Sequence, residues 1–349
     1  MKAGVVHAQK DIRYEEIAKP ALGKGQVLIK VKYTGICDSD VPRVNGTACH
    51  FYPNVLGHEF SGTVVELGEG VTALQKGDHV AGVPLIPCMQ CEDCMRGNYS
   101  LCKHYSFIGS REFGSFAEYV VVPERNAVKF EDAVSFEQGA FFEPATIALH
   151  GLQRVPFHGG GSVAVLGGGT IGMFVMQWAK IFGAKDAVVF DISPERLELG
   201  KRLGATACIN TRDADYMEQA LALTDGCGFD YVFETAGNTV TMKMAFALAA
   251  NKASVCFVGT PTRELSFTVE EWENINRKEF TLTGSWMSYS APFPGKEWIL
   301  TAHYFKTGAL QFDESFIFKK IPLSQIADAF ALYETPSAVK GKILIDSEN

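Results

Sequence analysis

The chain has 349 residues and a formal net charge of −8, and its length favours two domains over one hydrophobic core. The acidic balance argues against nucleic acid as the main partner, because binding a phosphate backbone needs clustered lysine and arginine. The longest apolar region, 163–179, contains three consecutive glycines and is too short for a membrane span. The N-terminus lacks the apolar core of a signal peptide. We therefore expect a cytoplasmic protein without membrane contact.

The first 150 residues are expected to form mainly β-structure. Alternating apolar residues over 26–33, 60–67 and 116–122 predict strands, and single glycines punctuate the segment. No long helical period is found in this part of the chain. The segment 340–345 also has the character of a strand, and we expect the C-terminal tail to return to the first domain.

Strands and helices alternate from about residue 160 onward. An apolar strand at 162–166 precedes a helical stripe over 170–183 and a second strand at 187–190. A second helix is expected to start with Ser193 as N-cap and Pro194 at the first helical position. Further strands are expected at 207–209, 230–233 and 254–258. This alternation predicts a doubly wound parallel sheet of the Rossmann type.

A glycine-rich turn joins the first of these strands to its helix, and its sequence is Gly167-Gly168-Gly169-Thr170-Ile171-Gly172. The pattern G-x-G-x-x-G between a strand and a helix is typical of dinucleotide binding. Gly167 would permit the tight turn, Gly169 would let the backbone approach a pyrophosphate, and Gly172 would let helix and strand pack closely. The N–H groups of the first helical turn, at Thr170 and Ile171, would face the phosphates.

Asp191 lies at the end of the second strand, nineteen residues after Gly172. A carboxylate here accepts hydrogen bonds from the ribose hydroxyls and repels a 2′-phosphate, so the sequence favours NAD over NADP. The alternative is that Asp191 only starts a turn. Arg196 keeps NADP open, because a nearby arginine could bind a 2′-phosphate, although we expect it beside the adenosine.

Four cysteines fall within fifteen residues: Cys88, Cys91, Cys94 and Cys102. Short spacers let one loop surround a tetrahedral zinc ion with four thiolates. Bacterial iron–sulfur sequences have a three-residue last gap followed by proline, whereas here the gap is seven residues and Lys103 follows. Packing of the four side chains as small apolar groups is the remaining alternative. We predict a closed, structural zinc site.

Cys37, His58 and Glu143 stand far apart in the sequence, and each alone is unremarkable. A single cysteine is usually a small buried residue, whereas histidine is the commonest metal ligand. Glu143 interrupts an apolar stretch and needs a partner. The residues alone do not join these three side chains into one site.

Longer stretches do join them, because the chain resembles the zinc-dependent medium-chain alcohol dehydrogenases over essentially its whole length. The first group of matching stretches is Gly35-Ile36-Cys37-Asp38-Ser39-Asp40, Gly57-His58-Glu59 and Gly77-Asp78, with the cysteine lobe and the glycine-rich turn. Within this family it most resembles the polyol dehydrogenases, above all those that oxidise galactitol 1-phosphate. The stretches specific to that branch are Tyr52-Pro53, Leu56–Gly62, Val83–Cys88, Phe107–Arg111, Glu234–Gly237 and Gly284–Met287.

The resemblance implies that Cys37, His58 and Glu143 hold a catalytic zinc ion, a Lewis acid for the substrate oxygen. Glu59 would bind the metal directly or through water. Two zinc ions per chain, one catalytic and one structural, follow from this assignment.

Two further residues receive roles from the same resemblance. Ser39 would accept the alcohol proton, and Asp40 would orient the imidazole of His58. The chain departs from many relatives at Pro42, where a histidine often ends the proton relay, and at Asp38, for which the sequence gives no account.

The implied domains are a GroES-like β domain from 1–150 and 287–349, with the zinc lobe at 84–104, and a Rossmann NAD-binding domain from 151–286. The implied reaction is the NAD-dependent oxidation of a sugar-alcohol phosphate, galactitol 1-phosphate to tagatose 6-phosphate. Arabinitol phosphate and unphosphorylated polyols such as sorbitol are alternatives, and a non-catalytic dinucleotide-binding protein is a more distant one. We expect a homodimer.

A phosphorylated substrate needs a cationic cradle. The candidates are Arg43, Arg111 and Lys296, which fall in or near the matching stretches. Each of them could equally be an ordinary surface charge.

Overall fold

A computed structural model describes residues 1–335 and 338–348. It divides into two compact units. Unit 1 contains Met1–Glu143, Tyr289–Gly308 and the residues from Glu314 on, and unit 2 contains Pro144–Ser288 and Ala309–Asp313. Among the described residues no helix combines the length and the apolar character needed to cross a membrane. We describe each unit separately.

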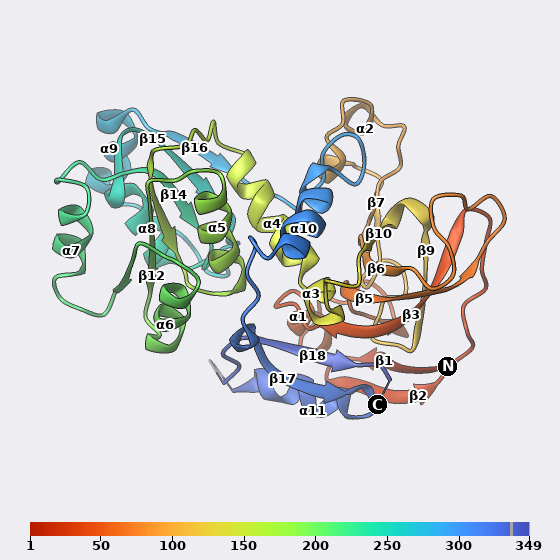
Figure 1. The fold of residues 1–349 in the computed structure, drawn as a ribbon. Coiled ribbons are helices and arrows are strands. Elements are labelled where there is room, and N and C mark those ends of the chain that lie inside the picture. The colour runs from red at the N-terminus through yellow and green to blue at the C-terminus, as the bar shows by residue number, and fades with distance from the viewer. Residues whose placement is uncertain (336–337, 349) are drawn as a thin grey trace. The chain divides into compact units, whose positions relative to one another are not determined.

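Unit 1 is built mainly of strands (Figure 1). Its strands are β1 (Lys2–Ala8), β2 (Asp11–Glu16), β3 (Gln26–Gly35), β4 (Asn54–Val55), β5 (Glu59–Leu67), β6 (His79–Gly82), β7 (Leu85–Ile86), β8 (Ser106–Phe107), β9 (Tyr119–Pro123), β10 (Ala127–Phe130), β17 (Ile317–Pro322) and β18 (Lys342–Asp346). Its α-helices are α1 (Val41–Val44), α2 (Glu92–Met95), α3 (Phe136–Ala140), α10 (Lys296–Thr307) and α11 (Ile326–Ala331). Short 3-10 helices occur at Tyr99–Leu101, Glu124–Asn126, Glu314–Phe316, Leu323–Gln325 and Leu332–Glu334.

Strand β3 organises the larger sheet of unit 1, which runs β10-β6-β5-β3-β18-β17, with β9 also paired to β3. Its alternating Val27, Ile29 and Val31 are fully buried and pack in one core with Phe60 and Val64 of β5. Strand β18 pairs antiparallel with the end of β3, so the C-terminal tail lies beside the first strands of the chain. A smaller sheet has the order β2-β1-β4.

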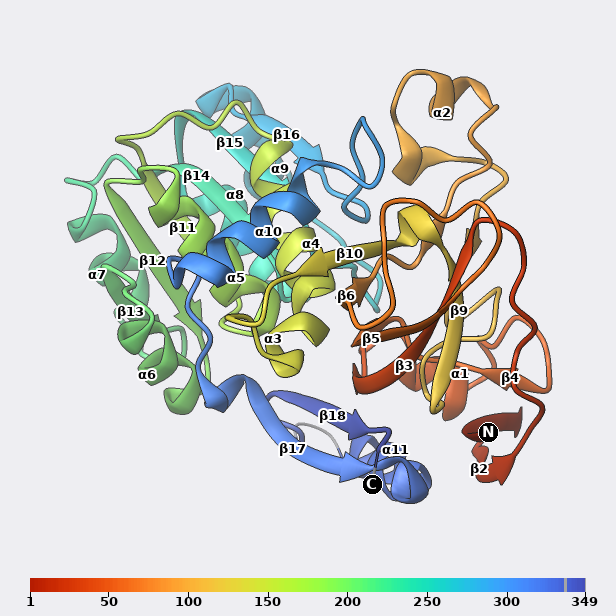
Figure 2. The same cartoon turned by 45° about the vertical axis from the view of Figure 1, so that its right-hand side comes forward.

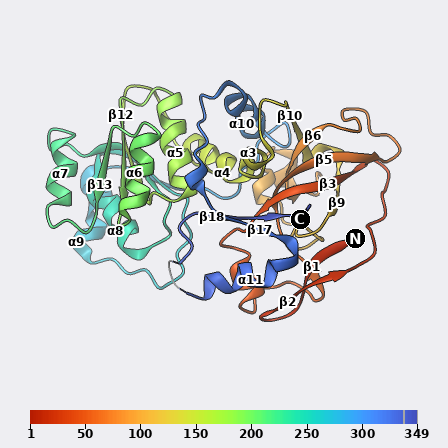
Figure 3. The ribbon, with the colours of Figure 1, turned by 60° about the horizontal axis from the view of Figure 1, so that its bottom comes forward.

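Unit 2 is a six-stranded parallel sheet. Its strands are β11 (Ser162–Leu166), β12 (Asp186–Asp191), β13 (Ala207–Asn210), β14 (Phe229–Glu234), β15 (Ala249–Phe257) and β16 (Thr281–Gly284). The helices are α4 (Phe142–Gln153, which begins in unit 1), α5 (Thr170–Ile181), α6 (Pro194–Arg202), α7 (Tyr216–Ala222), α8 (Thr239–Leu248) and α9 (Val269–Lys278). The strands lie in the sheet in the order β13-β12-β11-β14-β15-β16. The chain thus starts in the middle of the sheet and winds outward in both directions, which is the doubly wound arrangement. Helices α5 and α6 cover one face and α8 and α9 the other (Figure 3). The predicted fold class is confirmed.

Local sequence signals explain several boundaries in unit 2. The Ser193 side chain accepts a hydrogen bond from the N–H of Arg196, and Pro194 occupies the first helical position of α6, as predicted. In α9, Thr268 and Glu271 form a reciprocal capping box.

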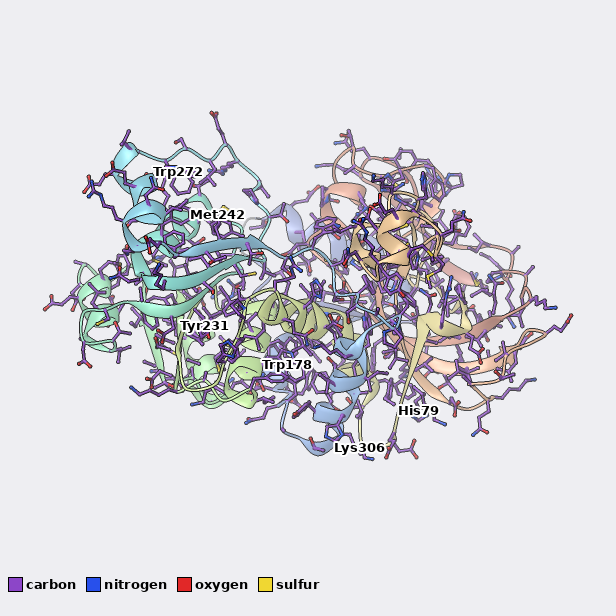
Figure 4. The ribbon with its side chains drawn as sticks, turned by 90° about the horizontal axis from the view of Figure 1, so that it is seen from above. His79, Trp178, Tyr231, Met242, Trp272 and Lys306 are labelled. Carbon is purple, nitrogen blue, oxygen red and sulfur yellow. The ribbon has the colours of Figure 1, made fainter. Side chains whose placement is uncertain are left out.

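Helix α4 corrects the expectation that no long helix precedes residue 150. Its apolar residues Phe142, Ala145, Leu149 and Leu152 follow a helical spacing and are all buried. Pro144 lies in the first turn, where the missing N–H costs nothing, so the helix tolerates it. The border between the units falls at Glu143, earlier than the expected residue 150. Trp178 (labelled in Figure 4) donates a hydrogen bond to the carbonyl of Ala145 and ties this helix into unit 2.

Candidate active site

The fold brings Cys37, His58 and Glu59 together in unit 1, with one donor atom of each within 4.8 Å of the others. Cys37 lies two residues beyond the end of β3, and Glu59 begins β5. These strands pair in a register that places Gly35 opposite Glu59. The sheet register therefore assembles a thiol, an imidazole and a carboxylate, a donor set that suits zinc.

Asp40 supports this group from a fully buried position. Its Oδ2 accepts a hydrogen bond from the N–H of Cys37 at 3.1 Å, and its Oδ1 lies 3.3 Å from Nδ1 of His58. Burial lowers the pKa of His58, but the charges of Asp40 and Cys37 outweigh this and raise it well above its ordinary value. The imidazole sits where a positive charge is favoured, and the Asp40 contact is the one that an orienting role requires.

Glu143 lies outside this group of three but close to it. It stands in the first turn of α4, and burial together with the nearby charge of Glu59 raises its pKa to about 7. Burial and the charge of Glu143 in turn raise the pKa of Tyr289 well above its ordinary value. A nearby cation would stabilise the ionised form of a carboxyl group whose pKa is raised in this way, which fits the ligand role that the resemblance implies for Glu143.

Lys342, which the sequence analysis did not single out, binds Glu59. Its Nζ lies 2.9 Å from Oε1 and 2.6 Å from Oε2 of Glu59, and both residues are buried. Burial opposes the charge of Lys342, yet the charges of Glu59, Cys37 and Asp38 raise its pKa. Asp38, which had no explanation from the sequence, is thus part of the anionic surroundings of this lysine. A lysine that begins an otherwise apolar strand was the available signal, because a buried lysine needs a partner.

The structure also places Ser39 and the two predicted arginines, Arg43 and Arg111. Ser39 is exposed, with its Oγ 3.3 Å from Sγ of Cys37, and Nη1 of Arg43 donates to its carbonyl oxygen. Arg111 lies over the ring of Tyr105, 4.7 Å from its centroid. Burial and the charges of Arg111 and Arg43 lower the pKa of His50. The structure thus brings both arginines near one imidazole.

Lys296, the third phosphate candidate, does not join them. It is exposed at the start of α10, a helix that packs against β10. Within the described part of the chain, its charge is not among those that act on His50.

The four cysteines converge in one loop, which lies between β7 and β8 in the sequence. This loop contains helix α2, which is labelled in Figure 2. The Sγ atoms of Cys88 and Cys94 are 3.9 Å apart, as are those of Cys91 and Cys102. A tetrahedral zinc ion with Zn–S bonds of about 2.3 Å needs sulfur atoms about 3.8 Å apart, so the lobe fits the ion. A hydrogen bond from the N–H of Cys94 lowers the pKa of Cys91 to about 6, which prepares one thiolate.

The glycine-rich turn connects β11 to α5 in the predicted way. Gly167 has φ +106°, a conformation that a side chain disfavours. A Cβ atom at Gly172 would collide with the carbonyl oxygen of Gly167, so close packing of helix on strand requires glycine there. A Cβ atom at Gly169 would meet nothing within 4 Å, which leaves room before the helix N-terminus. The N–H groups of Thr170 and Ile171 begin the helix at this open place.

Asp191 ends β12 beside this turn. Its Oδ2 accepts a hydrogen bond from the N–H of Gly168 at 2.7 Å, and its Oδ1 accepts one from the N–H of Ser193 at 2.8 Å. Arg196 Nη1 lies 3.6 Å from Oδ2. The carboxylate both shapes the turn and partly balances the arginine that could attract a 2′-phosphate.

Two family models match the chain: the alcohol dehydrogenase GroES-like domain over residues 23–132 and the zinc-binding dehydrogenase over residues 170–300. Galactitol 1-phosphate 5-dehydrogenase of Escherichia coli K12 is 39% identical over 299 residues, which cover 85% of this chain and 86% of that protein. Sorbitol dehydrogenase of Bacillus subtilis is 34% identical over 75% of this chain and 76% of its own length.

Solved structures extend the match. The crystal structure of galactitol-1-phosphate dehydrogenase from Escherichia coli has a TM-score of 0.93 and 36% identity, and the match covers 99% of this chain and all of that one. A zinc-binding dehydrogenase from Sinorhizobium meliloti, solved bound to NADP, has a TM-score of 0.89 and 30% identity over 99% of this chain and 98% of its own.

Proposed function

The chain belongs to the zinc-dependent medium-chain alcohol and polyol dehydrogenases, and we propose that it oxidises a sugar-alcohol phosphate with NAD as hydride acceptor. The observation that carries the proposal is the group of Cys37, His58 and Glu59, with Glu143 beside it. Galactitol 1-phosphate is the proposed substrate, and the keto-sugar tagatose 6-phosphate is the product.

Each side chain of the group has a defined task. Cys37, His58 and Glu143 would hold the catalytic zinc ion, and Asp40 would keep the imidazole of His58 in its ligating orientation. When bound, zinc supplies a Lewis acid that lowers the pKa of the alcohol. Ser39, exposed next to Cys37, takes the alcohol proton and passes it towards the nicotinamide ribose and water, because Pro42 cannot continue a relay.

The cofactor assignment rests on the turn and on Asp191. The open space before α5 leaves the backbone of Gly169 accessible to a pyrophosphate, and Asp191 offers the ribose a carboxylate. NAD is proposed because that carboxylate would repel a 2′-phosphate. The two-zinc content follows from the four-cysteine lobe as the structural site and Cys37 as an anchor of the catalytic one.

The phosphate of the substrate is assigned to Arg43 and Arg111. Arg43 donates a hydrogen bond to the carbonyl oxygen of Ser39, the proposed proton acceptor, and the charges of Arg43 and Arg111 both act on His50, so two permanent cations lie near one imidazole. Lys296 is the weakest of the three phosphate-binding candidates, because its helix α10 packs against β10.

The test is NADH formation from NAD with galactitol 1-phosphate, galactitol, arabinitol phosphate and sorbitol. Turnover of galactitol 1-phosphate well above the other three supports the proposal. A preference for arabinitol phosphate would keep the metal assignments and move the substrate to a pentitol phosphate. A preference for sorbitol would reject the arginine cradle, and binding of NAD without turnover of any substrate would favour a non-catalytic role.

We also propose a homodimer. Strand β16 is the terminal strand of the sheet among the described residues, and Leu282 on it is exposed. A terminal strand with an exposed apolar side chain favours pairing with a second copy. Light scattering of the wild type and of Leu282→Lys tests this, and a monomeric wild-type protein would reject it.

A further inference from the structure

The glycine-rich turn has a neighbouring loop on the next strand of the parallel sheet. Strand β11 lies between β12 and β14, so the loops that follow β11 and β14 leave the same edge of the sheet side by side. This is the place where the strand order reverses and where doubly wound folds bind dinucleotides. Leu166 is the register partner of Glu234, and the residues that follow them, Gly167 and Thr235, are in contact.

The hydroxyl of Thr235 binds the first peptide of the turn. Its Oγ1 lies 3.0 Å from the carbonyl oxygens of both Leu166 and Gly167. The carbonyl of Leu166 also accepts the N–H of Thr235 at 2.9 Å. Among the described residues, the Thr235 hydroxyl is the only hydrogen-bond donor to the carbonyl of Gly167, which is a buried residue. Loss of this hydroxyl would leave a buried acceptor unpaired, which is unfavourable.

The other end of the same peptide unit is held as well. The N–H of Gly168 donates to Oδ2 of Asp191 at 2.7 Å. Thr235 and Asp191 therefore fix the plane of the Gly167–Gly168 peptide from opposite ends. Glycine has more backbone freedom than any other residue, and Gly167 already has φ +106°. A turn of three consecutive glycines needs such contacts if it is to keep one conformation.

Glu234 in turn holds Thr235 in place. Its carboxylate is fully buried. Its Oε1 accepts hydrogen bonds from the N–H groups of Ala236 and Gly237 and from the hydroxyl of Thr241, at 2.9, 3.0 and 2.7 Å. These bonds fold the loop after Thr235 back over the end of β14. A Cβ atom added to Gly167 would lie 2.9 Å from Cβ of Ala236, so this loop packs directly on the glycine-rich turn.

The clamped peptide sets the direction of the N–H groups that follow it. Gly169 is the N-cap of α5, and Thr170 begins the helix, where the first N–H groups have no partner within the helix. We propose that Thr235 is a positioning residue for the dinucleotide: its hydroxyl fixes the Gly167–Gly168 peptide, so that the N–H groups of Gly169 and Thr170 are already aligned for a pyrophosphate. This inference rests on the proposed dinucleotide site.

The test compares the affinities for ADP and for adenosine by calorimetry, because ADP carries a pyrophosphate that adenosine lacks. Thr235→Val keeps the shape of the side chain and removes the hydroxyl. Its affinity for ADP should fall by about 10-fold or more, whereas its affinity for adenosine should stay near the wild-type value. Thr235→Ser restores the hydroxyl and should bind ADP like the wild type. Thr239→Val, the same change at the first residue of α8, is the matched control and should also bind ADP like the wild type.

Each outcome decides between separate claims. An affinity for ADP that Thr235→Val leaves unchanged overturns the positioning role alone. An equal loss of affinity for ADP and adenosine overturns it too, because a general loosening of unit 2 would act on both ligands. A wild type that binds ADP no more tightly than adenosine overturns the proposed dinucleotide site and this inference with it. If Thr235→Val does not fold, Thr235→Ala also removes the hydroxyl and should weaken ADP binding alone, and wild-type ADP binding by that variant would overturn the role.

Discussion

The two groups of candidate metal ligands in unit 1 are built in opposite ways. The cysteine lobe takes four thiols from fifteen consecutive residues, and the loop holds itself together with N–H contacts of Cys91 to Cys88 and of Cys88 to Cys102. The Cys37 group instead takes its members from the end of one strand and the starts of another strand and a helix. A local loop fixes the first geometry, whereas the register of a sheet fixes the second. The two sites should therefore fail in different ways.

The largest expected effect is a loss of catalytic activity without a loss of folding stability, caused by Cys37→Ala. Cys37→Ala removes a proposed zinc ligand while leaving the lobe intact, so kcat/KM should fall by about 10³-fold or more, with zinc content falling from two ions to one. Thermal unfolding should change little, because the fold does not depend on this ion. The measurements are NADH formation, metal analysis and a melting curve. Retention of full activity in Cys37→Ala would reject the assembled site.

The lobe should show the reverse pattern. Cys94→Ala removes a buried ligand of the structural ion, and structural zinc binding in small zinc-finger peptides is worth about 10–16 kcal/mol at pH 7, so a loss of several kcal/mol of stability is expected. Limited proteolysis should then cut within 88–102. Met95→Ala is the matched control, because its side chain is the exposed neighbour of Cys94. A Cys94→Ala protein with two zinc ions and wild-type protease resistance would show that the lobe is not a metal site.

The contrast between a local loop and a sheet register also explains which features could be predicted from the sequence. The spacing of the lobe and the glycine-rich turn with its flanking strand and helix were visible because their geometry is local. The Glu59–Lys342 pair was not visible, because a shift of one residue in either strand register would turn these side chains to the other face of the sheet. Helix α4 was missed, because Glu143 interrupts the apolar stretch at its start. The family resemblance joined Cys37 to His58 and Glu143, but it did not point to Lys342.

A smaller effect concerns the pH dependence of the metal-free protein. Burial and Glu59 raise the pKa of Glu143 to about 7 from an ordinary value of 4.5. A raised pKa means that the folded state holds a proton that the unfolded chain releases. The contribution of Glu143 to stability is thus fully present below pH 4.5 and is lost as the pH rises through about 7. At about 1.4 kcal/mol per pKa unit, the upper limit is roughly 3.5 kcal/mol.

Glu143→Gln isolates that contribution. Urea unfolding of the zinc-free wild type at pH 5, 6 and 7.5 should show stability declining with pH, and the decline should be smaller in the variant. An equal decline in both proteins would assign the pH dependence to other groups. Adding zinc should stabilise the wild type more than the variant, and this added stability should be larger at pH 7.5 than at pH 5, because a ligand carboxylate must be ionised.

The smallest expected effect lies in the cofactor turn, which is local like the lobe but carries recognition. Asp191→Asn keeps an oxygen that can accept the N–H of Gly168, so the turn should remain while the negative charge is lost. Arg196, 3.6 Å from that carboxylate, then becomes available to a 2′-phosphate. The ratio of kcat/KM with NADP to that with NAD should rise by roughly 10- to 100-fold, equivalent to about 1–3 kcal/mol. Adding Arg196→Ala to the variant should remove most of this gain, because the arginine supplies the new attraction. A wild type that already prefers NADP would show that Arg196 outweighs Asp191. The identity of residue 191 alone would then not predict the cofactor, although the backbone geometry of the turn was predictable from the sequence.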